Sequence, residues 1–281
     1  MKKQLIISGI AVALVATLFL FGSTTAPKLA LPAADEHSAN SFNIQHFIDD
    51  AKQQLTPSQS ITLGKLENSV KRGDVSAQQI AAYTHLAAFW RDSAHEFEPY
   101  AWYLSEAAKL DKSEKNLTFA AQLILANLRG EPDIAKLSWE TDLSLDLFQR
   151  ALELNPNNDE TKIGIGSCYI YGKARSNPQE TMNGINVLRE VVAKDSTNMR
   201  AQLVLGIGGY ISKQYDKAIY RLKKVLDAEP DNLEAMAYLG DVYADKGDKQ
   251  EAIRYYEMSK KLANNPEYTE EVNKRIKSLQ K

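Results

Sequence analysis

The sequence predicts an all-α fold in which helical hairpins repeat and stack as a solenoid behind an N-terminal transmembrane helix. Helical apolar spacing runs through the chain after residue 42, without strand-like alternation. Residues of the same chemistry recur 34 positions apart in the C-terminal half. An uncharged apolar run from Leu5 to Phe21 precedes the repeats. These three observations define the fold class.

The composition is that of an ordinary globular protein, with 44% hydrophobic and 25% charged residues and a net charge of −2. This balance argues against disorder. The absence of a basic excess gives no footprint for nucleic acid, so we expect no nucleic-acid partner. The single cysteine, Cys168, cannot form an internal disulfide or a zinc site that needs several thiolates. We expect it to be a small buried residue, with a reactive or intermolecular thiol as the alternative.

Residues 1–26 are predicted to form a signal-anchor or transmembrane helix. Lys2 and Lys3 precede the apolar run, which is 17 residues long. As a helix it spans about 25 Å, near the lower limit for a bilayer core of about 30 Å. The best cleavage site follows Ala26, where Pro27 would hinder a signal peptidase. We therefore favour an uncleaved anchor, with a cleaved signal peptide or a buried helix as alternatives.

The basic residues before the run also predict its orientation. The positive-inside rule places the N-terminus in the cytoplasm and the body beyond the inner (plasma) membrane as a single-pass protein. In a Gram-negative bacterium that compartment is the periplasm. Residues 27–41 are predicted to be a linker, because Pro27 and Pro32 break any continuous helix from the membrane.

The repeat is clearest near the C-terminus. Equivalent pairs 34 residues apart are Leu205-Gly206 with Leu239-Gly240, Ala218 with Ala252, Leu222 with Tyr256, and Val225 with Ser259. One unit earlier the pattern recurs at Ile165-Gly166, Tyr169, Gly184, Leu188 and Val191. That unit has six extra residues between its two helices, in the region 171–180.

These positions resemble the tetratricopeptide repeat (TPR) family, whose unit is a helix–turn–helix. The best match reads Met236, Leu239, Gly240, Tyr243, Ala252, Tyr256 and Ser259. A more degenerate unit carries Tyr83, Leu86, Ala87 and Trp90, and another runs from Leu117 through a long turn at Gly130 and Pro132. The resemblance implies a right-handed superhelix of hairpins in which small residues lie where two helices approach closely.

The domain organisation follows from this register. We predict an N-terminal helical cap over 42–75, a TPR array of about five units over 76–266 and a C-terminal capping helix over 267–281. Thr56-Pro57-Ser58-Gln59 has the pattern of a capping box with proline at the first helical position. Val272, Ile276 and Leu279 form a narrow apolar stripe that suits the last helix to cover the array.

We find no pattern that indicates an enzyme, a cofactor or a metal centre. No nucleotide-binding or hydrolase motif occurs, and no HExxH pair is present. His85 and His95 near Glu96 and Glu98 leave a weak metal site as a minor alternative. The chain is therefore predicted to have no catalytic residues.

The resemblance also implies a binding surface, since the first helices of a TPR array line a concave groove. The predicted groove residues are Ile163, Ser167, Ile170, Arg200, Leu203, Ile207, Ile211, Glu234, Asp241 and Asp245. The isoleucines and Leu203 form an apolar stripe suited to an amphipathic helix or an extended apolar segment. The acids of the last unit would favour a basic partner. The lysine and asparagine of the TPR clamp for chaperone tails are replaced by Thr84 and Ala88 in the first unit.

The predicted function is a membrane-anchored scaffold, with its array in the periplasm, that recruits or organises envelope or secretion proteins through this groove. The protein or peptide partner is unidentified. The alternative is a self-associating structural subunit, in which a second copy of the chain or the capping helix covers the apolar stripe. A third interpretation, a small-ligand or enzyme accessory domain, has no supporting feature in the sequence.

Overall fold

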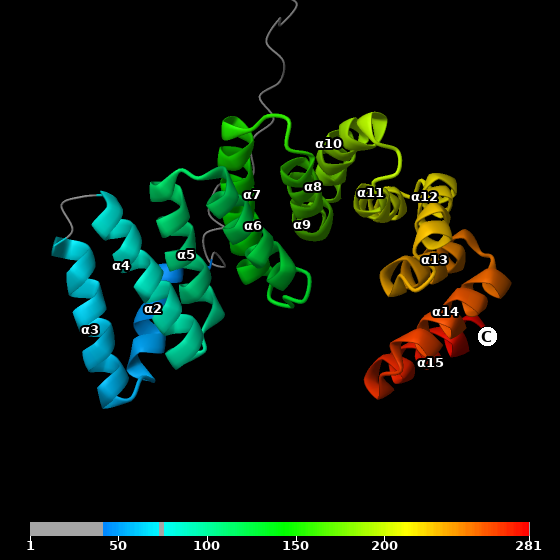
Figure 1. Cartoon of the computed structure of the whole chain (residues 1–281). Coiled ribbons are helices and arrows are strands. Elements are labelled where there is room, and N and C mark those ends of the chain that lie inside the picture. The colour runs from blue at the N-terminus through cyan, green and yellow to red at the C-terminus, as the bar shows by residue number, and fades with distance from the viewer. Residues whose placement is uncertain (1–41, 73–75, 281) are drawn as a thin grey trace, which may run out of the picture. The chain divides into compact units, whose positions relative to one another are not determined.

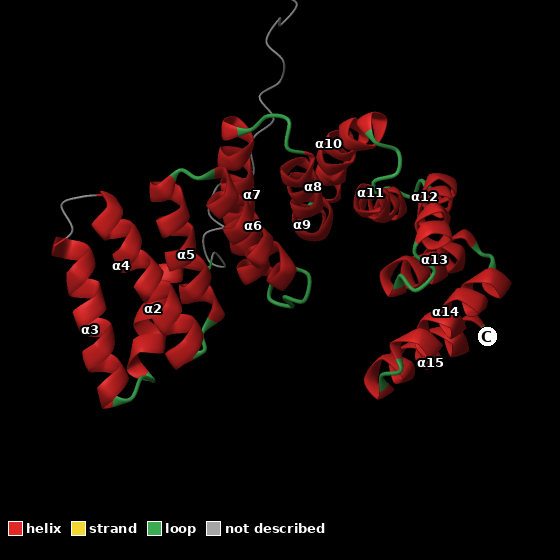
Figure 2. Ribbon diagram, viewed as in Figure 1, coloured by secondary structure: helices red, strands yellow, loops and turns green. Residues whose placement is uncertain are grey.

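The computed structural model describes residues 42–72 and 76–280. This part of the chain consists of helices joined by short loops and contains no strand, as Figure 2 shows. The predicted anchor and linker, residues 1–41, lie outside the described residues. None of the helices in the described ranges is both long and apolar enough to cross a membrane.

The helices follow one another in chain order (Figure 1). The first two are α2 (Ile44–Gln53) and α3 (Pro57–Arg72), and the last is α15 (Pro266–Leu279). Between them lie five helical hairpins, which we call units 1 to 5. They are α4 (Ser76–Phe89) with α5 (Phe97–Asp111), α6 (Glu114–Leu128) with α7 (Ile134–Leu154), α8 (Asp159–Ser167) with α10 (Thr181–Lys194), α11 (Met199–Ile211) with α12 (Tyr215–Ala228), and α13 (Leu233–Lys246) with α14 (Lys249–Ala263). The described chain is thus an all-α, TPR-like helical solenoid.

The hydrophobic interior is divided along the array instead of forming one centre. Buried side chains form four clusters in chain order, around Trp90, Phe148, Leu188 and Leu239. Apart from α2, each helix packs mainly on its neighbours in the sequence. Stability in such a stack comes from contacts within each hairpin and between adjacent hairpins.

A recurring N-cap starts the first helix of units 3, 4 and 5. The side chains of Asn158, Asn198 and Asn232 accept hydrogen bonds from the backbone N–H three residues ahead, at 3.2, 3.0 and 2.9 Å. Each satisfies one of the unpaired donors at a helix start. The same cap therefore fixes the start of three consecutive first helices.

A glycine of the first helix faces a large side chain of the second helix in the same three units. The pairs are Gly166 with Leu188, Gly206 with Leu222, and Gly240 with Tyr256. A Cβ atom on Gly240 would lie 2.4 Å from Cδ1 of Tyr256, far inside van der Waals contact. The two helices of each hairpin therefore approach as closely as the repeat pattern predicts.

Units 1 and 3 have more residues between their two helices than the regular repeat. These residues form π-helices and, in unit 3, also a short α-helix and a 3-10 turn. In unit 3 the first helix continues as the π-helix η3 (Cys168–Lys173), the short α9 (Ala174–Ser176) and the 3-10 turn η4 (Pro178–Glu180). The insertion therefore lies where the sequence predicts it. In unit 1 the first helix ends in the π-helix η2 (Trp90–Ala94), since one additional residue is absorbed by a wider turn.

Unit 2 differs from the prediction of a long turn after Leu128. Its two helices are joined only by residues 129–133, and α7 is 21 residues long, against 14 in α12. The side chain of Asp133 accepts hydrogen bonds from the N–H groups of Ala135 and Lys136, at 2.8 and 3.1 Å. This cap starts the helix directly after the turn, so the extra residues lengthen α7.

The ends of the array are covered by non-repeat helices. At α3 the capping box is confirmed: Thr56 N–H donates to Gln59 Oε1 at 2.9 Å, and Gln59 N–H donates to Thr56 Oγ1 at 3.4 Å. Helix α3 packs on α4, while α2 packs on α5. At the other end Val272 and Ile276 of α15 are buried against unit 5, and the outward face of α15 is polar.

Candidate functional site

The first helices of units 2 to 5 converge on a cavity of about 140 Å³. Its polar lining is Gln122, Arg129, Ser167, Tyr171, Arg200 and Glu234, and its apolar lining is Leu125, Ala126, Leu203 and Val204. Ala126, Arg129 and Arg200 are exposed, so this side of the cavity opens to solvent. The cavity therefore joins four hairpins at one point on the surface formed by the first helices.

Three polar side chains meet across this cavity from three different units. Arg129, at the end of α6, forms an ion pair with Glu234 in the first turn of α13. The Arg129 guanidinium also lies over the Tyr171 ring, 4.6 Å from its centroid. The Tyr171 hydroxyl donates to Glu234 Oε1 at 3.1 Å. We call Arg129, Tyr171 and Glu234 the clasp, because they link units 2, 3 and 5.

The Tyr171 phenol stays protonated within the clasp. Burial of the ring, followed by the neighbouring Glu234 carboxylate, raises the pKa of Tyr171 well above 10. Its hydroxyl is therefore a hydrogen-bond donor at neutral pH. The clasp consequently has two donors, Arg129 and Tyr171, directed at one carboxylate.

The second guanidinium of the cavity, that of Arg200, has a different partner. Arg200 lies in the first turn of α11 and pairs with Glu160 in the first turn of α8. Glu160 does not line the cavity. The cavity wall therefore holds two guanidinium groups and one carboxylate, beside an apolar strip formed by Leu125, Leu203 and Val204. Such a surface suits a ligand with an apolar part and a polar or charged group.

Comparison with known proteins identifies part of the array. Residues 210–270, from the end of α11 into α15, match the tetratricopeptide repeat family model. This segment is similar to tetratricopeptide repeats. Tetratricopeptide repeat protein 8 of Caenorhabditis elegans is 22% identical over 212 residues, which is 75% of this chain and 39% of the relative. The chain thus spans about two fifths of that relative's length.

Solved structures of low identity are also similar. MamA 41-end from Desulfovibrio magneticus RS-1 is 21% identical and has a TM-score of 0.48, with coverage of 68% of this chain and 97% of that chain. PilW, described as a widely conserved type IV pilus biogenesis factor, is 18% identical with a TM-score of 0.48, and the match covers 71% of this chain and 92% of that chain. Identities and TM-scores at this level say nothing about function.

Four of the groove residues predicted from the TPR register line the cavity. They are Ser167, Arg200, Leu203 and Glu234, from units 3, 4 and 5. The sequence predicts that Glu234 presents free negative charge to a basic partner. Its carboxylate is instead held by Arg129 and Tyr171, which largely compensates that charge.

Three of the predicted groove isoleucines lie inside the array. Ile163 and Ile207 have no exposed surface and Ile170 has 1%, while Ile211 packs at the edge of the same cluster. The first helices α8 and α11 contact each other directly, and a Cβ on Gly208 would lie 2.8 Å from Cδ1 of Ile170. Ile163, Ile170 and Ile207 are therefore covered within the chain, by α8, η3, α10 and α11, whereas Leu203 remains at the cavity.

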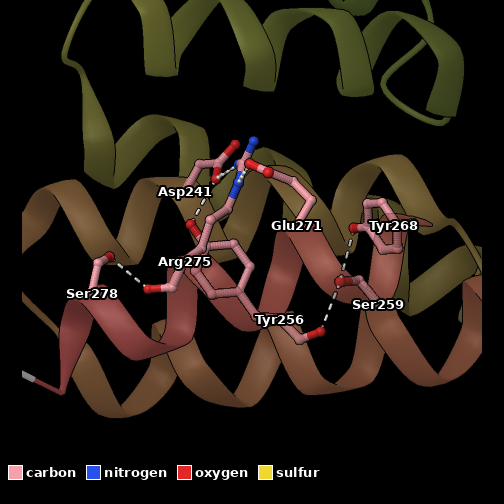
Figure 3. Close-up of polar contacts among 7 residues, drawn as sticks. All are labelled: Asp241, Tyr256, Ser259, Tyr268, Glu271, Arg275 and Ser278. Carbon is pink, nitrogen blue, oxygen red and sulfur yellow. Dashed lines mark hydrogen bonds and ion pairs between the residues drawn. The ribbon is translucent and has the colours of Figure 1, made fainter. Parts of the chain in front are cut away.

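The acidic residues predicted further along unit 5 lie apart from the cavity lining. Asp241 accepts hydrogen bonds from the Tyr256 hydroxyl and from Arg275 Nη1 of α15, both at 2.7 Å. Figure 3 shows Arg275 between Asp241 and Glu271, to which its Nε donates at 3.1 Å. Asp245 remains exposed at the end of α13. The capping helix thus occupies one carboxylate of the expected acidic edge.

Unit 2 and the π-helix η3 contribute cavity residues that the TPR register does not predict. The missed residues are Gln122, Leu125, Ala126, Arg129, Tyr171 and Val204. Unit 2 has no Leu-Gly pair to mark its register. The N-cap Ser113 is the sequence signal that indicates the register of unit 2. Its side chain accepts a hydrogen bond from Asn116 N–H, as the asparagine caps do in later units.

The one cysteine of the chain lies outside the cavity and has a structural partner. Cys168 is buried, as expected, and donates a hydrogen bond to Ser144 Oγ at 3.3 Å. Burial raises the pKa of its thiol to about 12, so it is not a ready nucleophile. No cluster of three or more His, Cys, Asp or Glu side chains with metal-site spacing occurs among residues 42–72 and 76–280.

Proposed function

We propose that this chain is a membrane-anchored scaffold that binds a protein partner through the cavity formed by the first helices of units 2 to 5. The observation that carries the proposal is the convergence of four hairpins on one solvent-open cavity with an apolar strip and charged walls. A repeat array supplies an extended surface, and a cavity within it serves as an anchor point for one or two side chains of a partner.

The size of the cavity favours a peptide segment over a small free ligand. A volume of about 140 Å³ is well below the roughly 300–1,000 Å³ of sites that enclose a drug-sized ligand. It is enough for a side chain of an extended or helical segment whose remainder lies along the neighbouring first helices. The partner is therefore proposed to be a protein that presents such a segment.

A blocking substitution tests this function. Ala126 is exposed at the cavity, so Ala126→Trp fills the site without disturbing the core. The control is Ala228→Trp at the exposed end of α12, outside the cavity. Membranes carrying the full chain are cross-linked, and the captured proteins are compared. We expect specific partners to be lost from Ala126→Trp and retained by the control. The same partners in both variants, with thermal unfolding unchanged, would count against the cavity.

The membrane anchor is proposed from the sequence alone. Lys2 and Lys3 followed by the uncharged run to Phe21 support an anchor whose body lies in the periplasm or another extracytoplasmic space. Alkaline carbonate extraction of membranes, followed by protease treatment of spheroplasts, tests both points. We expect the full chain to resist extraction and its body to be digested from outside. Release of a shortened chain into the soluble fraction would instead indicate a cleaved signal.

The alternative function is self-association. In that case the chain binds further copies of itself instead of envelope or secretion proteins. Its original basis, an uncovered apolar stripe, is weakened because Ile163, Ile170 and Ile207 are buried within one chain. Multi-angle light scattering of the full chain in detergent separates the two. We expect a monomer, whereas a stable dimer or larger assembly would favour the alternative.

A further inference from the structure

The clasp is an internal ion pair placed at the point where a ligand would bind. Arg129 and Glu234 belong to units 2 and 5, and they meet on the wall of the cavity. The Tyr171 ring supports the guanidinium at 4.6 Å, and its hydroxyl holds the carboxylate at 3.1 Å. The cavity therefore already contains one bound carboxylate, and that carboxylate belongs to the chain itself.

The guanidinium groups around the cavity have capacity for a further acceptor. The side chains of Arg129 and Arg200 are 45% and 46% exposed. Each guanidinium offers five N–H donors, and one carboxylate partner uses at most two of them in a bidentate pair. Each guanidinium is paired with one carboxylate, Arg129 with Glu234 and Arg200 with Glu160, so the four groups together carry no net charge. The unused N–H donors, and not a net positive charge, are what an additional anion would meet there.

We propose that Arg129, Tyr171 and Arg200 form a seat for an Asp or Glu side chain of the partner peptide, and that Glu234 occupies this seat until the partner displaces it. This inference rests on the proposed function, because it names the chemistry recognised at the same cavity. The sequence predicts that Glu234 attracts a basic partner. The proposed seat instead binds a partner with an acidic side chain. The residues also differ from the Thr84 and Ala88 positions at which the sequence lacks a chaperone-tail clamp.

The side chains around the seat also favour one type of residue next to the acidic residue of the partner peptide. Leu125 and Val204 are almost fully buried, and Leu203 is partly exposed beside Arg200. These side chains form an apolar strip within the same cavity, so an aliphatic residue next to the peptide carboxylate would be buried there. The preferred segment is therefore acidic and aliphatic together, such as a Leu-Glu pair.

Competition by Glu234 has a measurable consequence. If Glu234 holds the seat, the binding-competent fraction is reduced, and the apparent affinity falls by that fraction. Glu234→Gln keeps the side-chain shape but removes the charge that competes. We expect this variant to bind an acidic peptide about tenfold more tightly than the wild type. Arg200→Ala removes a donor without breaking the clasp and is expected to weaken binding by about tenfold.

The test uses fluorescence anisotropy of the full chain in detergent with a labelled peptide of Ser-Leu-Glu repeats. Peptides of Ser-Leu-Gln and Ser-Leu-Lys repeats are the comparison probes. Glu190→Gln is the matched control, because it removes one acid from an exposed pair with Lys162 outside the cavity. Arg129→Lys is the second variant, since it keeps the charge but loses the planar fork. Thermal unfolding of every variant shows whether the array remains intact.

We expect the acidic peptide to bind better than both comparison peptides, better still to Glu234→Gln, and more weakly to Arg200→Ala and Arg129→Lys. Glu190→Gln should match the wild type. Equal binding by Glu234→Gln and the wild type, tighter binding of the lysine peptide, or no binding of the acidic peptide to Glu234→Gln would each overturn the seat. Loss of partners from Ala126→Trp would still stand in those cases, so the seat and the proposed function fail separately.

Discussion

Units 4 and 5 follow the repeat closely, whereas units 2 and 3 depart from it. The irregular units nevertheless supply most of the residues that line the cavity. Units 4 and 5 keep the 34-residue period, the glycine contacts at Gly206 and Gly240, and most of the family match over 210–270. Units 2 and 3 depart from the repeat through the 21-residue α7 and the π-helix η3. Yet units 2 and 3 contribute six of the ten residues that line the cavity, Gln122, Leu125, Ala126, Arg129, Ser167 and Tyr171.

The irregular turns explain how those side chains reach the site. Tyr171 lies within η3, where the wider turn of a π-helix changes the direction of the side chains that follow. Arg129 is the C-cap residue of α6, so its long side chain extends beyond the helix end toward unit 5. Departures from an ideal repeat are expected where a protein builds a functional surface. The irregular units supply two of the three clasp residues, Arg129 and Tyr171, and the regular unit 5 supplies Glu234.

The largest expected effect tests whether unit 2, in the irregular half, has a firmly packed core. Phe148 of α7 has no exposed surface, and its ring lies where a Cβ on Gly164 would clash at 2.3 Å. Phe148→Ala leaves a cavity in the core, so we expect the free energy of unfolding to fall by about 3–5 kcal/mol. Urea unfolding followed by circular dichroism measures this loss. Phe119→Ala, at a ring that is 55% exposed on α6, should change stability by less than about 0.5 kcal/mol. A loss in Phe148→Ala as small as that in Phe119→Ala would mean that unit 2 is loosely packed.

An intermediate effect concerns a buried acid of unit 2. Glu140 of α7 has no exposed surface; its Oε1 accepts from Asn127 Nδ2 at 2.7 Å, and its Oε2 has no hydrogen-bond partner among the described residues. Burial, together with the nearby Glu131 and Glu98 carboxylates, raises the pKa of Glu140 from 4.5 to about 7, although Asn127 and Lys136 act in the opposite direction. The folded state therefore binds this proton more tightly than the unfolded state.

The sign of the pH dependence follows from that shift. The stabilising contribution of the Glu140 proton is complete below about pH 4.5 and is lost as the pH rises to about 7. Glu140→Gln keeps the acceptor for Asn127 but carries no charge, so we expect it to stabilise the fold at pH 8 by about 1–3 kcal/mol. Thermal unfolding between pH 4.5 and 8 measures the slope. Glu270→Gln, on the surface of α15, is the control. An unchanged slope in Glu140→Gln would show that another group is responsible.

The smallest expected effect lies at the regular end of the array. Arg275 joins α15 to Asp241 of unit 5 in a partly exposed pair, so its contribution is reduced by solvent screening. We expect Arg275→Ala to lower global stability by no more than about 1 kcal/mol but to speed hydrogen exchange in α15. Lys274→Ala, whose pair with Glu270 is more exposed, should leave that exchange unchanged. Equal exchange in both variants would mean that apolar contacts alone hold the capping helix.

The sequence predicted the parts of the fold that repeat. The 34-residue spacing of Leu239-Gly240 and Leu205-Gly206 is a direct consequence of close helix packing, so it can be read without coordinates. The capping box at Thr56 was equally accessible, because its hydrogen bonds are local. The start of α7 was missed, although Asp133 is an N-cap residue, because Gly130 and Pro132 suggested a longer turn.

The site was predicted only in part, because it depends on contacts between distant units. Ser167, Arg200, Leu203 and Glu234 followed from the register, but the register alone placed Ile163 and Ile207 on the same surface. Their burial depends on how closely α8 approaches α11, which spacing within one helix does not reveal. The clasp joins residues 105 positions apart, Arg129 and Glu234, and no local pattern links them.

Hydrogen–deuterium exchange on the full chain, alone and with a captured partner, tests the central claim most directly. If the partner binds at the cavity, the backbone amides of α6, η3 and the first turn of α11 should exchange more slowly. Protection would then appear in the irregular and the regular half together. Ala126→Trp should show no such gain. Protection confined to the second helices α7, α10 and α12, or an unchanged pattern along the first helices, would contradict the account.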